Sequence, residues 1–368
     1  MKSGETHSIA INGHEIALEG AEPIWAEIDR FFAPYYPVST VAARHPEITI
    51  SASVDGAETR EPCVDLHRYV APSTPEITGQ IEQHRRPSGV TVTLDRANRH
   101  VTIVAGHPTE LNLELRIMLR DQIFLPLERS AGAAMFHASC VQREGRAAFF
   151  MGEREAGKTT ALLSTLSTGA YDIVASDRIK LWVDPASGEL RLVGHPSNTN
   201  LHHRTVESDP LTRSLIDELR GRYDHEGKFS ISTHRLAALA GCRLVPEASP
   251  ALVVFPQILR TSDGLSVTAL TDRDEVARLI AENAITAESS NERARWLNLV
   301  PPVSDEGRGA IIEAAVAAAS RCIAYRVHGT HAEVSALLRD PGWEAALAHR
   351  AVNNPSAHQE LSRNISRV

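Results

Sequence analysis

The sequence predicts an α/β fold, with a core of mixed strands and flanking helices preceded by a smaller α/β domain. Three observations predict it. A short apolar run at 147–151 leads through a glycine-containing loop into a helical pattern at 159–166. Alternating apolar residues before position 106 are typical of strands. The chain after position 250 contains a further apolar strand and several helical patterns, and such mixing of the two periods is typical of the α/β class.

The N-terminal domain is expected to span 1–108, with the remaining domain at 109–368. Its expected elements are strands within 8–18 and 47–54, a helix at 21–32, a surface loop at 71–88, and a hairpin made by 89–94 and 100–104. A helix at 109–128 would connect the domains. Further on, the patterns predict a strand at 251–255 and helices at 209–220, 273–284, 307–320 and 331–350.

The loop between the strand at 147–151 and its helix is a complete G-x-x-x-x-G-K-T motif. It consists of Gly152, Glu153, Arg154, Glu155, Ala156, Gly157, Lys158 and Thr159, and Thr160 follows it. In such a loop the backbone N–H groups surround nucleotide phosphates, the lysine reaches the β- and γ-phosphates, and the threonine hydroxyl binds Mg²⁺. The helix dipole also favours an anion there. A nucleotide is the expected ligand, and a turn that only connects a strand to a helix is the alternative.

A single carboxylate follows the next apolar strand, which begins at Tyr171. Asp177 stands at the end of Ile173-Val174-Ala175-Ser176. If this strand pairs beside the loop strand, Asp177 points toward the metal and the γ-phosphate. It could hold Mg²⁺, accept a proton from an attacking hydroxyl, or do both. A turn-forming aspartate between two strands is the alternative.

One histidine lies upstream on a strand that should fold back onto the loop strand. The strand at 134–141 contains His137, and the turn Arg143-Glu144-Gly145-Arg146 would join it to the loop strand as a hairpin. His137 could then approach Asp177 and assist proton transfer. A hydrogen-bonded histidine in the core is the alternative.

These residues resemble the HPr kinase/phosphorylase family. His137, the loop at 152–159 and Val174-Ala175-Ser176-Asp177-Arg178-Ile179 occur in the family's order and spacing, and the similarity covers roughly residues 130–185. The resemblance implies a core related to phosphoenolpyruvate carboxykinase and phosphate transfer from a nucleotide to a hydroxyl. It also implies that Lys158 and Thr159 bind phosphates and Mg²⁺, that His137 assists the catalytic acid, and that Asp177 is a catalytic or metal-binding carboxylate. A kinase-like relative acting on a peptide or small molecule is expected, and a homo-oligomer is plausible by the same analogy.

Three departures from that family bear on activity. The family has two adjacent aspartates where this chain has Ser176 and Asp177, so one general base is missing. Glu153 and Glu155 stand inside the loop, where negative charge opposes phosphate binding unless it points away or is paired. The downstream glycine-rich signature of the phosphorylase reaction is not found, which argues against HPr itself as substrate.

Other basic residues are weaker candidates for contact with phosphate or substrate. Arg178 follows the carboxylate, and Arg222 and Lys228 lie in a segment rich in glycine and cations that could fold over the phosphates. A solvated loop is the alternative for each. His202, His203 and Arg204 lie in a similarly polar segment, and nothing in the sequence assigns them a role.

Composition narrows the class of protein. The 38 basic and 46 acidic residues give a net charge of −8, and no dense basic patch is present, so neither nucleic acid nor an anionic membrane is an expected partner. The 4 cysteines form no C-x-x-C pair. No apolar signal core opens the chain and no long uncharged run occurs, so a cytoplasmic location is expected.

The sequence thus predicts a phosphotransferase that uses Mg²⁺ with ATP or GTP and transfers the γ-phosphate to a hydroxyl of a peptide, protein or small molecule. Two alternatives stay open. The chain could be a nucleotide-binding regulator or scaffold that has lost transfer activity, which Ser176 motivates. It could also be an ATP-dependent enzyme that activates a carboxylate.

Overall fold

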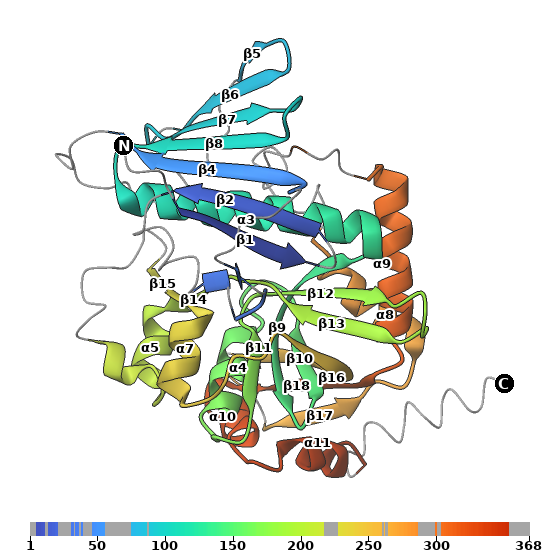
Figure 1. The fold of residues 1–368 in the computed structure, drawn as a ribbon. Coiled ribbons are helices and arrows are strands. Elements are labelled where there is room, and N and C mark those ends of the chain that lie inside the picture. The colour runs from blue at the N-terminus through green and yellow to red at the C-terminus, as the bar shows by residue number, and fades with distance from the viewer. Residues whose placement is uncertain are drawn as a thin grey trace. The chain divides into compact units, whose positions relative to one another are not determined.

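The protein is a mixed α/β structure (Figure 1). The computed structural model describes residues 5–11, 14–20, 31–32, 34–36, 38–39, 46–55, 75–86, 88–216, 227–259, 261, 264–285, 299 and 303–352. Its Cα positions divide into two compact units. Unit 1 comprises Met1–Gly132 and Thr286–Arg308, and unit 2 comprises Ala133–Ile285 and Gly309–Val368. The expected boundary at 108/109 differs from this division, because the long helix that starts there belongs to unit 1.

Unit 1 contains an eight-stranded sheet with the order β3-β1-β2-β4-β8-β7-β6-β5. Its strands are β1 (Glu5–Ile11), β2 (His14–Gly20), β3 (Val38–Ser39), β4 (Ile48–Val54), β5 (Glu76–Thr78), β6 (Ile81–Arg85), β7 (Thr91–Asp95) and β8 (His100–Ala105). β4 pairs in parallel with β2 and β8, and the hairpins pair antiparallel. The strands expected within 8–18 and 47–54 and the β7–β8 hairpin are confirmed.

One expectation for unit 1 was wrong, and another falls largely outside the described residues. The segment 71–88 was expected to be a surface loop, and this is wrong, because it contains β5 and β6. The polar residues of β6 lack the apolar alternation that predicts a strand. This strand is stabilised by backbone pairing with β7 rather than by an apolar face. The helix expected at 21–32 falls largely outside the described residues.

The helix α3 (Pro108–Ala131) packs on β8 and β4. Proline suits its first turn, the side chain of His107 caps its start, and Gly132 ends it in the left-handed region with φ 63°. Two buried ion pairs hold it within unit 1. Arg86 donates to Glu114 at 2.9 Å and 3.2 Å, and Arg308 donates to Glu128 at 2.5 Å and 3.1 Å.

Unit 2 is built on a mixed sheet with the order β10-β9-β12-β13-β16-β18-β17. β11 adds to β9, and β10 also pairs with β16. The strands are β9 (Ala134–Arg143), β10 (Arg146–Met151), β11 (Asp172–Ala175), β12 (Arg178–Val183), β13 (Leu190–Gly194), β16 (Glu247–Leu259), β17 (Ser266–Ala269) and β18 (Ile323–Thr330). β9 and β10 form the predicted hairpin through Glu144 and Gly145, whose φ angles of 54° and 79° suit its two-residue turn.

The strand after the loop helix does not pair beside the loop strand, so that expectation was wrong. β11 and β12 both pair antiparallel with β9, whereas the second neighbour of β10 is β16, in parallel. β9 has 10 residues and is long enough to pair with both short strands along one edge. β10 lies between β9 and β16, so neither of its edges is open to β11.

Helices cover both faces of this sheet. Ala148 and Phe150 of β10 face a core shared with α4 (Lys158–Leu166), α7 (Thr233–Ala240), α10 (His331–Leu338) and α11 (Trp343–Val352). Ala147 and Phe149 face the opposite core, which contains residues of α8 (Arg273–Ala281) and α9 (Asp305–Ala319). This alternation is the period of two expected of a strand covered on both sides.

The helices predicted at 273–284 and 307–320 are confirmed as α8 and α9, and the strand at 251–255 lies within the longer β16. The helix predicted at 331–350 is two helices, because Pro341 and Gly342 interrupt it. Of the helix expected at 209–220, the described residues contain a 3₁₀ turn at Arg213–Leu215 followed by a helical residue, Ile216, and the remainder lies outside the described residues.

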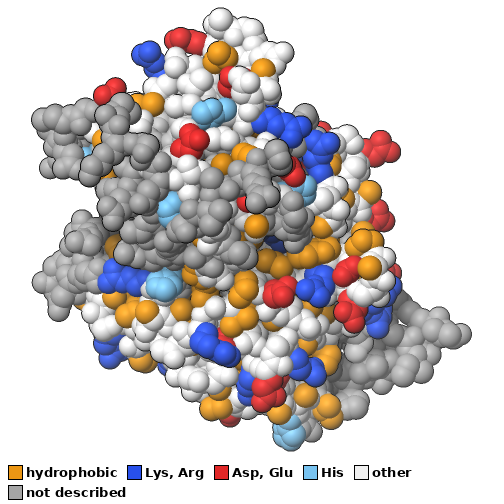
Figure 2. All heavy atoms as spheres, viewed as in Figure 1, with side chains coloured by type: hydrophobic (Ala, Val, Ile, Leu, Met, Phe, Trp, Pro, Cys, Tyr) orange, Lys and Arg blue, Asp and Glu red, His pale blue; other side chains and the backbone are white. Residues whose placement is uncertain are grey.

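Two properties of the described residues bear on the class of protein. None of the described helices combines the length and the apolar character that a membrane span requires. Acidic and basic side chains both occur across the face drawn in Figure 2, with hydrophobic side chains between them.

Candidate functional site

The predicted phosphate-binding loop connects β10 to α4. Gly152 and Gly157 have φ angles of 152° and 110°, which side-chain-bearing residues rarely adopt. A Cβ at Gly157 would lie 2.6 Å from Ile258, and one at Gly152 would lie 3.0 Å from the Cβ of Ala156. The N–H of Ile258 also donates to the carbonyl of Ala156 at 3.1 Å. Both glycines of the motif are therefore required by the backbone and by the close approach of β16.

The helix after the loop begins without a side-chain cap. At its N-cap, Gly157, no side chain accepts from the first turn, and that turn contains no acidic residue. The starts of α3, α7, α8 and α10 are all capped by a side chain. Because the first amides of a helix have no partner within it, the start of α4 is suited to an anion.

The motif lysine lies across the loop. Lys158 is 8% exposed, and its Nζ donates to the carbonyl oxygens of Gly152 at 2.6 Å and Glu153 at 2.9 Å. Burial lowers the pKa of the Lys158 ammonium, and the negative charge of Asp177 acts in the opposite direction. The ammonium is thus close enough to Asp177 for the two charges to interact, although 18 residues of chain separate them.

The loop interior is open to solvent. Glu153, Arg154 and Glu155 are all exposed, whereas Thr159 is half-buried and Thr160 is buried. Water therefore screens the two carboxylates, which weakens their repulsion of a phosphate on the loop. Glu153 and Glu155 therefore oppose an anion on the loop less than buried carboxylates would.

Asp177 and His137 contact each other, as the sequence predicted. Asp177 lies between β11 and β12, and its Oδ1 is 3.1 Å from Nε2 of His137. Its carbonyl accepts the N–H of Ala138 at 3.0 Å, and its Oδ2 lies 3.4 Å from Nε of Arg178. The break between β11 and β12 thus presents the carboxylate at the edge of β9.

The surroundings of Asp177 keep it ionised. Burial acts to raise the pKa of its carboxyl, but the hydrogen bond from His137 and the positive charges of Arg178 and Lys158 outweigh that effect. The pKa of Asp177 is therefore lowered below its ordinary value. An anionic carboxylate of this kind can bind a cation or orient a hydroxyl, and it is a weak base.

Ser176 stands where the resembled family has an aspartate, and its side chain contacts other hydroxyl groups. It is 3% exposed, and its hydroxyl lies 2.7 Å from that of Thr233 and 3.4 Å from that of Ser197. Thr233 in turn donates to the carbonyl of Ser197 at 2.8 Å. Ser176 therefore belongs to a group of hydroxyls at one end of the two-stranded sheet made by β14 (Asn198–His202) and β15 (Lys228–Ser232).

Asn283 is a site residue that the sequence did not indicate. Its Oδ1 accepts the N–H of Gly152 at 2.9 Å, its Nδ2 donates to the carbonyl of Leu279 at 2.8 Å, and its own carbonyl accepts the N–H of His137 at 2.8 Å. One asparagine at the end of α8 therefore connects the loop to the strand that carries the histidine. No motif marked it.

The structure brings together most of the predicted site. The loop, Lys158, Asp177, His137 and Arg178 form one group in unit 2. Arg222 lies outside the described residues. Lys228 begins β15 (Lys228–Ser232) and pairs with His202 at the end of β14 (Asn198–His202).

The donor set for Mg²⁺ is small. Among the described residues, no group of three or more His, Cys, Asp or Glu side chains could by itself hold a metal. A Mg²⁺ ion that binds together with a nucleotide takes one or two protein ligands and completes its shell with phosphate oxygens and water. Asp177 and the hydroxyl of Thr159 supply oxygen donors of the required kind.

A scan against protein-family models finds no match for this chain, and a search of curated proteins likewise finds none.

Proposed function

We propose that the protein is a phosphotransferase that uses Mg²⁺ and a nucleoside triphosphate, and that it is a kinase-like relative of the HPr kinase/phosphorylase family. One observation carries the proposal. A phosphate-binding loop with its lysine folded over it lies within electrostatic reach of a carboxylate, Asp177, that a histidine holds at 3.1 Å. Binding, charge neutralisation and orientation of an attacking group are the three requirements of phosphoryl transfer.

The loop and the start of α4 would bind the phosphates of the nucleotide. The amides of the first turn of α4 face the anion, and Lys158 exchanges its two carbonyl partners for phosphate oxygens. Thr159 and Asp177 would hold Mg²⁺, which neutralises charge on the β- and γ-phosphates. These contacts recognise phosphates and leave the base open, so ATP and GTP are both compatible with them.

Asp177 would also orient the acceptor hydroxyl. In the transfer, a bond forms between the acceptor oxygen and the γ-phosphorus, the bond from that phosphorus to the β–γ bridging oxygen breaks, and the hydroxyl proton passes to Asp177 or to solvent. His137 holds the carboxylate in place through its hydrogen bond. A weak base suffices because the transition state is loose and little proton transfer is needed before the phosphoryl group moves.

A nucleotide-binding regulator without transfer activity is the second candidate. The observation that favours it is the side chain at 176, where the hydroxyl is buried among Thr233 and Ser197 and supplies no second carboxylate. Activation of a carboxylate is a third candidate and differs from the kinase in its product, which would not retain the phosphoryl group. The acceptor under the first proposal is a hydroxyl of a peptide, protein or small molecule.

Calorimetric titration tests the nucleotide site. ATP and GTP are titrated with and without Mg²⁺ into the wild type, Lys158→Ala and Arg350→Ala, the last of which removes an exposed cation of α11. We expect Mg²⁺-dependent binding that is at least ~10-fold weaker in Lys158→Ala and unchanged in Arg350→Ala. Equal binding to all three proteins, or no binding to any of them, would contradict nucleotide binding by the loop.

Transfer itself separates the candidates. The wild type and Asp177→Asn are incubated with γ-labelled nucleotide and a pool of peptides and metabolites, and the products are weighed by mass spectrometry. A product heavier by one phosphoryl group, absent with Asp177→Asn, supports the kinase. Nucleotide binding without any turnover supports the regulator, and a condensed product that lacks phosphate supports carboxylate activation.

A further inference from the structure

The carboxyl ends of three parallel strands lie side by side at the phosphate-binding loop. β10 pairs in parallel with β16, and β16 pairs in parallel with β18 (Figure 1). β9 pairs with the other edge of β10, so β16 and β18 follow on the side away from β9. Ligands of open α/β sheets bind outside the carboxyl ends of such strands. The proposed function uses the end of β10 and gives the ends of β16 and β18 no role.

A row of apolar residues crosses these ends and starts at the loop. Ile258 of β16 contacts the loop directly, because its N–H donates to the carbonyl of Ala156 at 3.1 Å and a Cβ at Gly157 would lie 2.6 Å from its side chain. The register sets Ile258 beside Gly329 of β18. A Cβ at Gly329 would in turn lie 3.1 Å from Cδ1 of Leu265, which directly precedes β17. Ile258, Gly329 and Leu265 together form what we call the apolar strip.

The apolar strip is only partly covered by the rest of unit 2. Gly329 is buried, and its lack of a side chain lets Leu265 approach the backbone of β18. Ile258 and Leu265 are half-buried, and both pack against the core that α4 and α10 share. The strip crosses two strand spacings, or about 10 Å. It therefore continues the phosphate-binding loop as an apolar surface that is long enough to contact a ring system.

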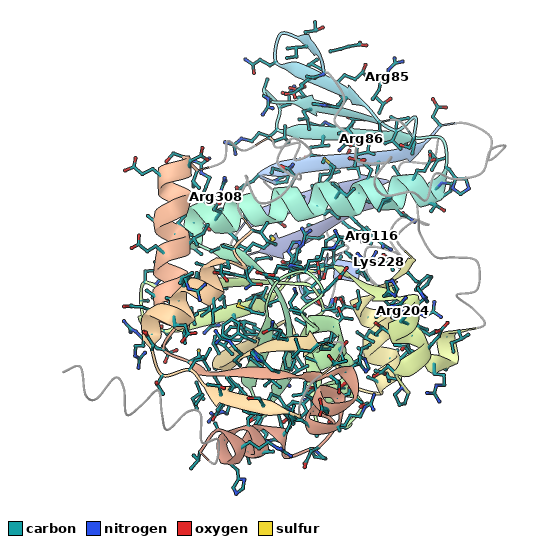
Figure 3. All side chains as sticks on the ribbon, turned by 180° about the vertical axis from the view of Figure 1, so that it is seen from behind. Arg85, Arg86, Arg116, Arg204, Lys228 and Arg308 are labelled. Carbon is teal, nitrogen blue, oxygen red and sulfur yellow. The ribbon has the colours of Figure 1, made fainter. Side chains whose placement is uncertain are left out.

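The surroundings of the strip do not suit a phosphate. The helix α10 begins beside it, but its start is capped, because the hydroxyl of Thr330 accepts the N–H of Glu333 at 3.3 Å and the Glu333 carboxylate accepts the N–H of Thr330 at 2.7 Å. That carboxylate would lie 3.3 Å from a Cβ at Gly329, so it places negative charge next to the strip. The cations of unit 2 labelled in Figure 3, Arg204 and Lys228, come from elements other than β16, β18 and α10. An uncharged group is the occupant that fits.

The position of Asp177 sets the direction of a nucleotide on the loop. The carbonyl of Asp177 accepts the N–H of Ala138 on β9, and its carboxylate interacts with the charge of Lys158. β9 and β16 lie on opposite sides of β10. A nucleotide whose γ-phosphate faces Asp177 therefore directs its ribose and base the other way, across Ile258 and toward β18.

We propose that the apolar strip binds the base of the nucleotide through the face of its ring. The proposal rests on the function proposed above and deepens it, because it assigns the part of the nucleotide that the loop does not recognise. Apolar side chains fix a ring by contact, whereas precisely placed polar groups are needed to distinguish one hydrogen-bonding edge from another. The loop thus selects the triphosphate, and the strip adds affinity for ATP and GTP alike.

Calorimetric titration with three ligands tests the strip. Mg·ATP, Mg·GTP and Mg·tripolyphosphate, which has no nucleoside, are titrated into the wild type, Leu265→Asn and the control Ile323→Asn. Ile323 is an apolar residue at the amino end of β18 and is 57% exposed. We expect the wild type and Ile323→Asn to bind both nucleotides at least ~10-fold more tightly than tripolyphosphate. Leu265→Asn should bind both nucleotides at least ~5-fold more weakly than the wild type, with its tripolyphosphate affinity unchanged.

The outcomes separate the strip from the loop. Equal affinity of the wild type for Mg·ATP and Mg·tripolyphosphate would overturn the proposal, and this comparison needs no variant. Wild-type nucleotide affinity in Leu265→Asn, a matching loss of tripolyphosphate affinity, or a loss for only one of the two nucleotides would overturn it as well. Failure of the wild type to bind any of the three ligands would contradict the proposed function itself. Circular dichroism of each variant checks that it is folded.

Discussion

Asn283 accepts the backbone N–H of Gly152 through its side-chain oxygen at 2.9 Å, although 131 positions separate the two residues. The same asparagine accepts the N–H of His137 through its carbonyl at 2.8 Å. The end of α8 therefore sets the position of the loop relative to the strand that carries the histidine. A residue outside every motif determines how two of the motif segments meet.

Replacing Asn283 should weaken both the fold and the site. Asn283→Ala leaves the N–H of the half-buried Gly152 without this partner, which costs about 0.5–1.5 kcal/mol of unfolding free energy. Because the loop loses a fixed point, nucleotide affinity should fall as well. Urea unfolding and calorimetric titration of ATP measure the two effects. Gln257→Ala, at an exposed position of β16, is the control and should change neither. An Asn283→Ala protein with wild-type stability and affinity would contradict this role.

Gly157 should tolerate no side chain. In Gly157→Ala, the new methyl group meets Ile258 at 2.6 Å and the backbone must keep a φ of 110°. We expect a loss of roughly 1–3 kcal/mol in stability and much weaker nucleotide binding. Thermal unfolding with and without ATP measures both effects.

Two companion variants divide that effect into its causes. Gly157→Ala with Ile258→Ala removes the collision but keeps the φ angle, so it should recover only part of the loss. Gly241 has a φ of 63°, and an added Cβ there would have no atom within 4 Å. Gly241→Ala therefore measures the loss of stability from a positive φ without a collision. If Gly157→Ala binds nucleotide normally, the loop geometry described above is wrong.

The Asp177 carboxylate should contribute to stability in a pH-dependent way. Its pKa in the folded protein is lowered by His137, Arg178 and Lys158, which outweigh burial. Its contribution is therefore present above the unfolded pKa of about 3.9 and is lost as the pH falls through the lower folded value.

The comparison with Asp177→Asn isolates that contribution. The difference in unfolding free energy between the wild type and Asp177→Asn should be constant at neutral pH and shrink as the pH falls below ~4. In a His137→Gln background the hydrogen bond that lowers the pKa is lost, so the change should be smaller. Urea unfolding between about pH 6 and pH 3 measures it. A difference that does not vary with pH would show that the pKa of Asp177 is not lowered.

The Arg86–Glu114 pair should be strongly coupled. The two side chains are 1% and 0% exposed and share two hydrogen bonds. Removing either partner leaves a buried charge, so Arg86→Met and Glu114→Leu should each cost about 3–5 kcal/mol, and the double variant should cost much less than their sum. Urea unfolding of the four proteins gives the coupling energy. Additive losses would mean that the two groups act independently.

Local features of the fold were predictable because neighbouring residues decide them. The β9–β10 hairpin followed from a glycine turn between two apolar runs, and the start of α4 followed from the loop motif. The contact between His137 and Asp177 was also anticipated, since the hairpin brings the strand of His137 back onto the loop strand. Exposure of Glu153 and Glu155 could not be read from the sequence, because it depends on which way the loop faces.

Features that depend on distant segments were missed. The neighbour of β10 is β16, about 100 residues further along the chain, and this pairing displaced the expected one with β11. The polar strand β6 gave no apolar signal because backbone hydrogen bonds with β7 stabilise it. Asn283 gave no signal either, because its contacts depend on the pairing of the chain around Ala284 with β9.

The sequence by itself determined which chemical groups are present: a loop with two glycines, a lysine at the start of the following helix, and one carboxylate, Asp177, directly before Arg178. The tertiary structure decided which groups face one another. It placed the hydroxyl of Ser176 in a buried group with Thr233, and it used Asn283 to connect the two motif segments. The groups present follow from the order of residues along the chain. Which of these groups face one another depends on strand pairing and core packing across the whole of unit 2.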